Sequence, residues 1–231
     1  MKDQLIQLGF GPLTGRVEKQ LDYESASLRI PVTAQLNGDA RFDYSLQLEK
    51  DGPGAYRLSG FEAVLQGSGE PARHYHFEAQ RGVTAAEAAN LLEGRAVRKS
   101  VETADDSVAF QWLQLDFREG EKGQLLEFQP GFAYDLENEL LKLATMLVQP
   151  ALAKKEVVQN LEAGNVAGFS VRNKGLFYVQ ADPAKGLKIF DAEKKTVEIP
   201  ELQKLARQPE KAKTIQLIKS PEQSRSYGLG Y

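Results

Sequence analysis

Residues 28–48 read LRIPVTAQLNGDARFDYSLQL, and this stretch decides the fold class. Apolar side chains alternate with polar ones through 28–36 and again through 40–48. Because side chains on an extended strand point alternately to its two faces, a period of two residues predicts strands with one buried and one wet face. The stretch therefore predicts two antiparallel strands that pack one face on a core.

The loop between these strands determines how they pair. Asn37-Gly38 alone suggests a two-residue hairpin turn. The two apolar faces coincide only if the loop has an odd number of residues, which places Leu36 opposite Ala40. Since a one-residue slip moves every side chain to the other face, we give the face pattern precedence over the dipeptide. Pro31 lacks a backbone N–H, so it predicts that the first strand lies at a sheet edge or carries a bulge.

Two further strands extend the pattern toward the C-terminus. After a glycine-rich turn, the apolar positions change parity at Ser59-Gly60, which predicts a β-bulge. A fourth strand follows, with Tyr75 and Phe77 on its inner face. Residues 27–80 therefore predict a four-stranded antiparallel meander.

Helices are predicted on both sides of this meander. Thr84 and Glu87 form a capping-box pattern at the start of one helix, and Gly94 follows its end. The other predicted helices are two short ones before residue 22, a leucine-striped helix over 134–148, one that starts at Pro150, and one over 201–206. Further strands are predicted at 95–101, 108–117, 167–171, 176–180 and 188–190.

The predicted strand over 108–117 changes its apolar face midway. Trp112 belongs to the face that is apolar at the start, and Leu113 and Leu115 belong to the face that is apolar afterwards. This pattern leaves two interpretations open, a bulge or a strand that is covered on both sides. We see no internal repeat in the sequence.

Together these elements predict an α+β protein. We expect an antiparallel β-meander with helices packed on one face, followed by a helical hairpin and a small β unit. The expected organisation is an N-terminal unit over 1–128, a second unit over 129–206, and a flexible, mildly basic tail over 207–231.

Composition limits the classes of protein to which this chain can belong. It has 231 residues, of which 42% are hydrophobic and 26% charged, as is typical of a globular protein with a sizeable core. Cysteine is absent, which excludes disulfides, thiolate zinc sites and cysteine nucleophiles. No apolar run approaches the length of a membrane span, and the first six residues lack the apolar segment of a signal peptide. We therefore expect a cytoplasmic protein with no membrane partner.

His74, His76 and Glu78 form an H-x-H-x-E pattern on the fourth predicted strand. A period of two places all three on the wet face, opposite Tyr75 and Phe77. Two imidazoles and a carboxylate suit a divalent metal, so these three residues are the candidate metal site. The alternative is that they are the ordinary polar face of an antiparallel sheet.

Two groups of carboxylates are candidates for acid–base chemistry. Asp105-Asp106 lies in a predicted loop, where aspartate is a common turn residue. Asp135, Glu137 and Glu139 lie at the start of a predicted helix, where negative charge suits the helix dipole. The sequence contains no P-loop, G-x-S-x-G, H-E-x-x-H or dinucleotide-binding glycine pattern. We therefore expect neither catalytic residues nor a cofactor.

Charge is distributed unevenly along the chain, whose net charge is −3. Residues 200–231 carry six Lys and Arg against three Glu, so they are net +3 and the remaining residues are net −6. With Tyr227 and Tyr231, this tail is a candidate electrostatic arm for nucleic acid or an acidic partner. The common alternative for such a tail is a solvated linker. The six basic residues of 200–231 are Lys204, Arg207, Lys211, Lys213, Lys219 and Arg225, and the arm itself would use Lys211, Lys213, Lys219 and Arg225.

Six short segments follow one another in a characteristic order. They are LLEGRAV (91–97), WLQLDF (112–117), GFAYDLE (131–137), LEAGN (161–165), ADP (181–183) and KIFD (188–191). In this order they resemble a family of uncharacterised bacterial proteins of the Bacteroidetes type, and the resemblance covers about residues 80–195. It implies a domain of unknown function that is sometimes associated with mobile elements, and it implies no activity, ligand or catalytic residue.

Three functions remain open at this point. The first is a non-catalytic cytoplasmic binding or interaction module whose partner is a protein. The second is a nucleic-acid-associated accessory protein of a mobile element that acts through its basic C-terminal tail. The third is a metal-dependent hydrolase centred on His74, His76 and Glu78. Because no catalytic template is present, we favour the first.

Overall fold

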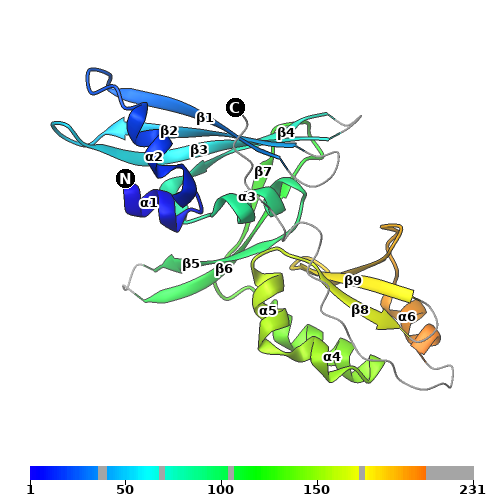
Figure 1. Ribbon diagram of the computed structural model, residues 1–231. Coiled ribbons are helices and arrows are strands. Elements are labelled where there is room, and N and C mark those ends of the chain that lie inside the picture. The colour runs from blue at the N-terminus through cyan, green and yellow to red at the C-terminus, as the bar shows by residue number, and fades with distance from the viewer. Residues whose placement is uncertain (36–40, 68–70, 104–106, 172–174, 207–231) are drawn as a thin grey trace.

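The computed structural model describes residues 1–35, 41–67, 71–103, 107–171 and 175–206. The chain is an α+β protein with three antiparallel sheets, as the sequence predicts (Figure 1). Helices lie between successive sheets, so the described elements stack in alternating β and α layers along the molecule (Figure 1).

The first sheet is the predicted meander. It consists of β1 (Ser27–Gln35), β2 (Arg41–Lys50), β3 (Tyr56–Gln66) and β4 (Arg73–Glu78), in that spatial order. Gln35 lies opposite Arg41, which is the register that an odd-length loop requires. The expected Leu36–Ala40 pair itself lies outside the described residues. The strand that contains Pro31 is at the sheet edge, which confirms that prediction.

The predicted β-bulge lies in the middle of β3. Gln47 of β2 is opposite Gly60, and the next residue, Leu48, is opposite Leu58, so Ser59 is the extra residue. Leu58 precedes the bulge and Phe61 follows it, and both are buried. The extra residue therefore lets the apolar side chains before and after it point to the same core.

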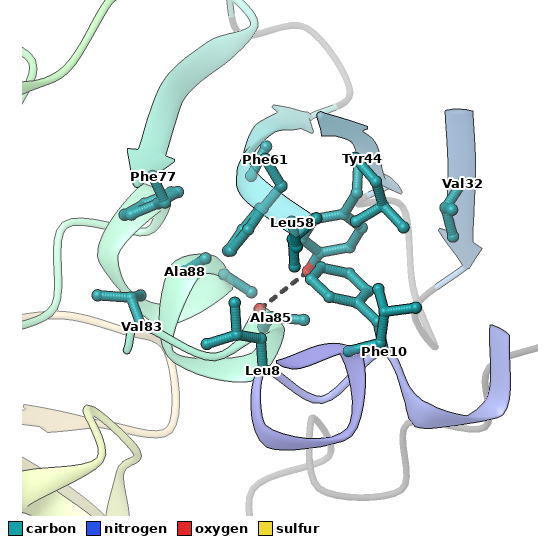
Figure 2. Close-up of a cluster of buried hydrophobic side chains, with 14 of the residues drawn as sticks. Leu8, Phe10, Val32, Tyr44, Leu58, Phe61, Phe77, Val83, Ala85 and Ala88 are labelled. Carbon is teal, nitrogen blue, oxygen red and sulfur yellow. Dashed lines mark hydrogen bonds between the residues drawn. The ribbon is translucent and has the colours of Figure 1, made fainter. Parts of the chain in front are cut away.

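Three helices cover the apolar face of this sheet. They are α1 (Lys2–Gln7), α2 (Thr14–Lys19) and α3 (Ala85–Leu92), and a short 3-10 turn (Gly11–Leu13) joins the first two. Phe10 packs edge-on against the rings of Tyr44 and Phe61, at centroid distances of 5.5 and 5.1 Å. The hydroxyl of Tyr44 donates a 3.0 Å hydrogen bond to the carbonyl of Ala85, so the one polar atom of this ring has a partner inside the core (Figure 2).

Helix α3 lies between two sheets. The capping box that the sequence predicts is present, since Thr84 accepts from the Glu87 backbone N–H and the Glu87 side chain accepts from the Thr84 backbone N–H. Its alanines are small enough to let a sheet approach each side, and Ala85, Ala88 and Ala89 are fully buried. The helix contacts β3 and β4 on one side and the second sheet on the other (Figure 1).

The second sheet consists of β5 (Val97–Glu102), β6 (Val108–Asp116) and β7 (Gln124–Phe128). β7 was not predicted from the sequence. The register of β6 is continuous with both neighbours, so its change of apolar face is no bulge. Leu113 and Leu115 pack into the core beneath the first sheet, whereas Trp112 packs into a second core. Of the two interpretations left open, coverage on both sides is the correct one.

The loop between β6 and β7 joins the first two sheets. The His74 backbone N–H donates to the Glu121 carbonyl at 3.0 Å, and the Gly123 N–H donates to the His74 carbonyl at 3.1 Å. This short parallel bridge lies on the outer edge of β4.

The second core belongs to the C-terminal half. It is built from α4 (Leu136–Leu147), α5 (Lys155–Glu162), α6 (Ile199–Ala206) and a third sheet. The strands of that sheet are β8 (Ala167–Val171), β9 (Gly175–Asp182) and β10 (Gly186–Asp191). The prediction that an α-helix starts at Pro150 is wrong, because Pro150–Ala153 form a 3-10 turn and the extended backbone of Lys154 separates it from α5.

The α3 segment and the α5 segment share one arrangement. Each is an eight-residue helix, and each is followed by a glycine in the left-handed region, Gly94 at φ 79° and Gly164 at φ 80°. Five residues after the last helical residue a strand begins, and it leads into a three-stranded antiparallel meander. Asn90 and Asn160 occupy equivalent positions near the two helix ends. The prediction that the chain has no internal repeat is therefore wrong for this structural unit.

The ends of α3 and α5 lie against each other. The Asn90 carboxamide donates to the carbonyl of Ala163 at 2.7 Å and to the side-chain oxygen of Asn165 at 3.1 Å. Arg95, itself buried, donates to the Asn90 side-chain oxygen at 2.6 Å. These hydrogen bonds between buried polar groups join the end of α3 to the end of α5.

Candidate functional site

The structure places His74, His76 and Glu78 on the outer face of the first sheet. His74 Nδ1 lies 3.5 Å from Glu62 Oε1 on the neighbouring strand, and the His76 ring lies over Gly60. An extended strand separates residues four apart by about 13 Å, so His74 and Glu78 do not converge on one point. In the part of the chain that the structure describes, no group of three or more His, Asp and Glu side chains could hold a metal ion.

The carboxylate candidates that the structure describes act on the local fold. Asp135 caps α4 by accepting the Asn138 backbone N–H at 3.0 Å. Glu139 pairs with Lys142 one turn later at 2.7 Å, and Glu137 is exposed in the first turn. Asp105 and Asp106 lie outside the described residues.

A cleft opens between the end of the first sheet and the second sheet. Its volume is about 430 Å³, which is within the range of small-molecule sites. One wall is the 3-10 turn Ala79–Arg81 after β4, and the opposite wall is the β5–β6 hairpin. We call this the inter-sheet cleft. Its lining residues are Gln80, Arg81, Lys99, Ser100, Val101, Glu102, Val108, Gln111 and Leu113.

Gln111 is the unusual residue of the inter-sheet cleft. It is only 9% exposed and lies directly opposite Lys99 in the β5–β6 ladder. Its carboxamide forms no hydrogen bond to any of the described residues. The Gln111 amide is not among the fully buried polar atoms that lack a partner, so it is open to the cleft and can donate hydrogen bonds to a ligand there.

Lys99 of the inter-sheet cleft is held in place by Glu87, a residue that does not line the cleft. Its ammonium donates to both oxygens of Glu87, at 3.1 and 2.9 Å, and the two side chains are only 17% and 13% exposed. Glu87 also caps α3 through the Thr84 N–H at 2.8 Å. The capping box therefore orients a cleft residue as well as starting a helix, while one N–H of the ammonium remains free for another acceptor.

Arg81 provides the second cation of the inter-sheet cleft. One of its terminal nitrogens donates to Glu127 of β7, and its Nε lies 3.9 Å from Glu78. The hydrogen bond to Glu127 raises the pKa of Arg81 above its ordinary value, so the guanidinium stays charged. A guanidinium has five N–H donors, and within the described chain only this one nitrogen donates a hydrogen bond.

The rest of the lining is apolar on one side. Leu113 is buried, Val101 is partly buried, and Val108 at the rim is 66% exposed. The cleft therefore combines hydrocarbon surface with the N–H donors of Lys99, Arg81 and Gln111. Glu87 and Glu127, the anions that pair with its cations, do not line it.

A second hollow of about 570 Å³ lies beside the β3 bulge and includes His76 and Glu78. Several of its polar groups bond to one another or to the backbone. Gln4 accepts the Leu58 N–H that the bulge leaves unpaired, at 3.1 Å, and Ser59 donates to the Gln47 carbonyl at 3.1 Å. The inter-sheet cleft, where two fixed cations flank an amide that bonds to no described residue, is the stronger candidate.

Sequence reasoning missed the inter-sheet cleft, although the sequence contains a signal for it. Lys99 falls between Val97 and Val101 on the buried parity of its strand, and Gln111 precedes Leu113 on the buried parity of the next. Polar residues at two facing core positions indicate either a buried pair or a site.

No family model, curated protein or solved structure matches this chain. Among the described residues, none of the helices has the length and apolar character needed to span a bilayer.

Proposed function

We propose that this protein is a non-catalytic binding module that takes part of a protein partner in the inter-sheet cleft. The observation that carries the proposal is the carboxamide of Gln111, which bonds to no described residue and lines the cleft beside two fixed cations. The groups around it favour binding over catalysis. Lys99 is engaged by Glu87 and Arg81 by Glu127, so the cleft presents hydrogen-bond donors rather than a nucleophile paired with a base.

A protein partner fits the position of the cleft. β5 is an edge strand of its sheet, and Ser100 and Glu102 of β5 line the cavity. An extended peptide can therefore lie along this edge while one of its groups enters the cleft. Val108 at the rim and Phe110 beyond it, 66% and 51% exposed, add apolar surface beside the opening. We propose the cytoplasm as the location, which suits a chain without cysteine.

The test is a screen of the full chain against a library of short peptides and small fragments, followed by ¹⁵N NMR. Ligands that bind the cleft should shift the side-chain NH₂ signals of Gln111. A Gln111→Leu variant should no longer bind these ligands. Gln159→Leu, the same change on an exposed face of α5, should bind as the native chain does. A library that shifts no cleft signal, or an enzymatic turnover that one substitution in the cleft abolishes, would overturn the proposal.

A further inference from the structure

We infer that the inter-sheet cleft recognises a carboxylate carried on an apolar group. This inference rests on the proposed function and names the chemistry that the cleft selects. In this cleft, a carboxamide that bonds to no described residue, two cations and apolar side chains line a single cavity.

The first argument is the balance of donors and acceptors. Gln111 offers two N–H donors and Lys99 one further N–H, since Glu87 takes the other two. Arg81 retains the N–H groups that Glu127 does not use. A carboxylate has two oxygens with about four acceptor positions and no donor, so it complements these donors better than an amide or an ammonium does.

The second argument is electrostatic. Both cations are paired with anions that lie behind the cleft wall, at Glu87 and Glu127. The cavity surface therefore presents the positive side of two ion pairs to a ligand. The only carboxylate of the lining, Glu102, is exposed at the outer end of β5. An anion that enters is bound by charge-assisted hydrogen bonds, which are stronger than neutral ones.

The third argument is shape. Leu113, Val101 and Val108 add hydrocarbon surface to the β5–β6 wall that also carries Lys99 and Gln111. A bare inorganic anion leaves this wall in contact with water, whereas an aliphatic group of a few carbons covers it. Two sources carry such a ligand, namely a small organic acid or the C-terminal residue of a peptide laid along β5.

The experiment titrates the full chain with N-acetyl-L-leucine and with N-acetyl-L-leucinamide, which differ only in the carboxylate. We expect the acid to bind at least about tenfold more tightly than the amide and to shift the Gln111 side-chain signals. A tripeptide that ends in leucine, with a free or an amidated C-terminus, separates the two sources. Tighter binding of the free tripeptide than of acetyl-leucine identifies a peptide terminus, and equal binding identifies a small acid.

Two variants test the assignment to the cleft. Gln111→Glu keeps the shape but adds a negative charge, so acid binding should be lost, and Gln159→Glu on α5 is the control with the same charge change. Because Gln111 is buried, the rim variant Val108→Glu serves as the second test, since its exposed position leaves folding intact. It should weaken the acid several-fold at low salt and less at high salt.

The outcomes separate this inference from the function on which it rests. If the amide binds as tightly as the acid, or Gln111→Glu binds the acid unchanged, the carboxylate assignment is overturned and the cleft remains a binding site. If neither probe nor either tripeptide shifts a cleft signal at millimolar concentration, the carboxylate assignment is also overturned. The library screen then decides by itself whether the cleft binds anything.

Discussion

The two helix-ending glycines offer a matched test of how tightly the two halves of the molecule are packed. Gly94 and Gly164 have the same backbone conformation, at φ 79° and 80°, and the same position after α3 and α5. Their surroundings differ. A Cβ on Gly164 would lie 2.9 Å from Asn90 Cβ and 2.9 Å from a methyl carbon of Val97, whereas a Cβ on Gly94 would meet no atom within 4 Å.

The expected losses follow from these two environments. A left-handed backbone costs a residue with a Cβ about 1–2 kcal/mol, and this applies to both alanine variants. Forcing a methyl group into a well-packed interior costs about a further 1–3 kcal/mol, and this applies only to Gly164→Ala. We therefore expect Gly94→Ala to lower the free energy of unfolding by about 1–2 kcal/mol, and Gly164→Ala by about 2–5 kcal/mol.

Chemical denaturation followed by tryptophan fluorescence measures both variants. Trp112 is the only tryptophan of the chain, and it lies in the second core on the strand that faces both cores. Equal losses for the two variants would refute the claim that Gly164 is needed for close packing. A larger loss for Gly94→Ala would refute the described geometry of the junction itself.

Three further predictions follow from contacts described above. Thr84→Ala removes the side-chain half of the α3 capping box and should cost about 0.5–2 kcal/mol in the same denaturation assay, whereas an unchanged midpoint would contradict the capping role. Tyr134→Phe removes the 2.7 Å hydrogen bond from the phenol to the Gly186 carbonyl and should cost about 0.5–1.5 kcal/mol. Burial raises the pKa of Tyr134 above its ordinary value of 10, so the folded state holds this proton more tightly than the unfolded chain does. The contribution of Tyr134 to the free energy of unfolding is therefore complete below pH 10 and declines as the pH rises above 10. In urea titrations above pH 10, the Tyr134→Phe variant should lose less stability with rising pH than the native chain does. A chain cut after residue 128 exposes the Trp112 face of the second sheet, so it should show red-shifted tryptophan emission and more dye binding than the full chain.

Much of the fold follows from local patterns in the sequence. The period of two over 28–48 predicts the first two strands and their register, and the parity change at Ser59 predicts the bulge. These features are predictable because each depends on a few neighbouring residues. β7 was missed because adjacent Leu125 and Leu126 do not alternate, and only pairing with β6 makes the segment a strand.

The candidate site was beyond such local reasoning. The H-x-H-x-E pattern is conspicuous in the sequence, but an extended strand spreads its side chains along a sheet face. The inter-sheet cleft combines residues from a 3-10 turn after one sheet and a hairpin of another, and nothing in the local sequence brings Arg81 next to Lys99 or Gln111. Only the packing of the second sheet against α3 places them together.

The edges of the first sheet have a consequence for the behaviour of the protein at high concentration. An exposed sheet edge can act as a template for a strand of another molecule, which leads to fibrils or domain-swapped dimers. At one edge Pro31 removes a donor from β1, and at the other the chain from Glu121 to Gly123 bonds to both backbone groups of His74. Both ends of the largest sheet are thus interrupted, which protects it against polymerisation through its edges.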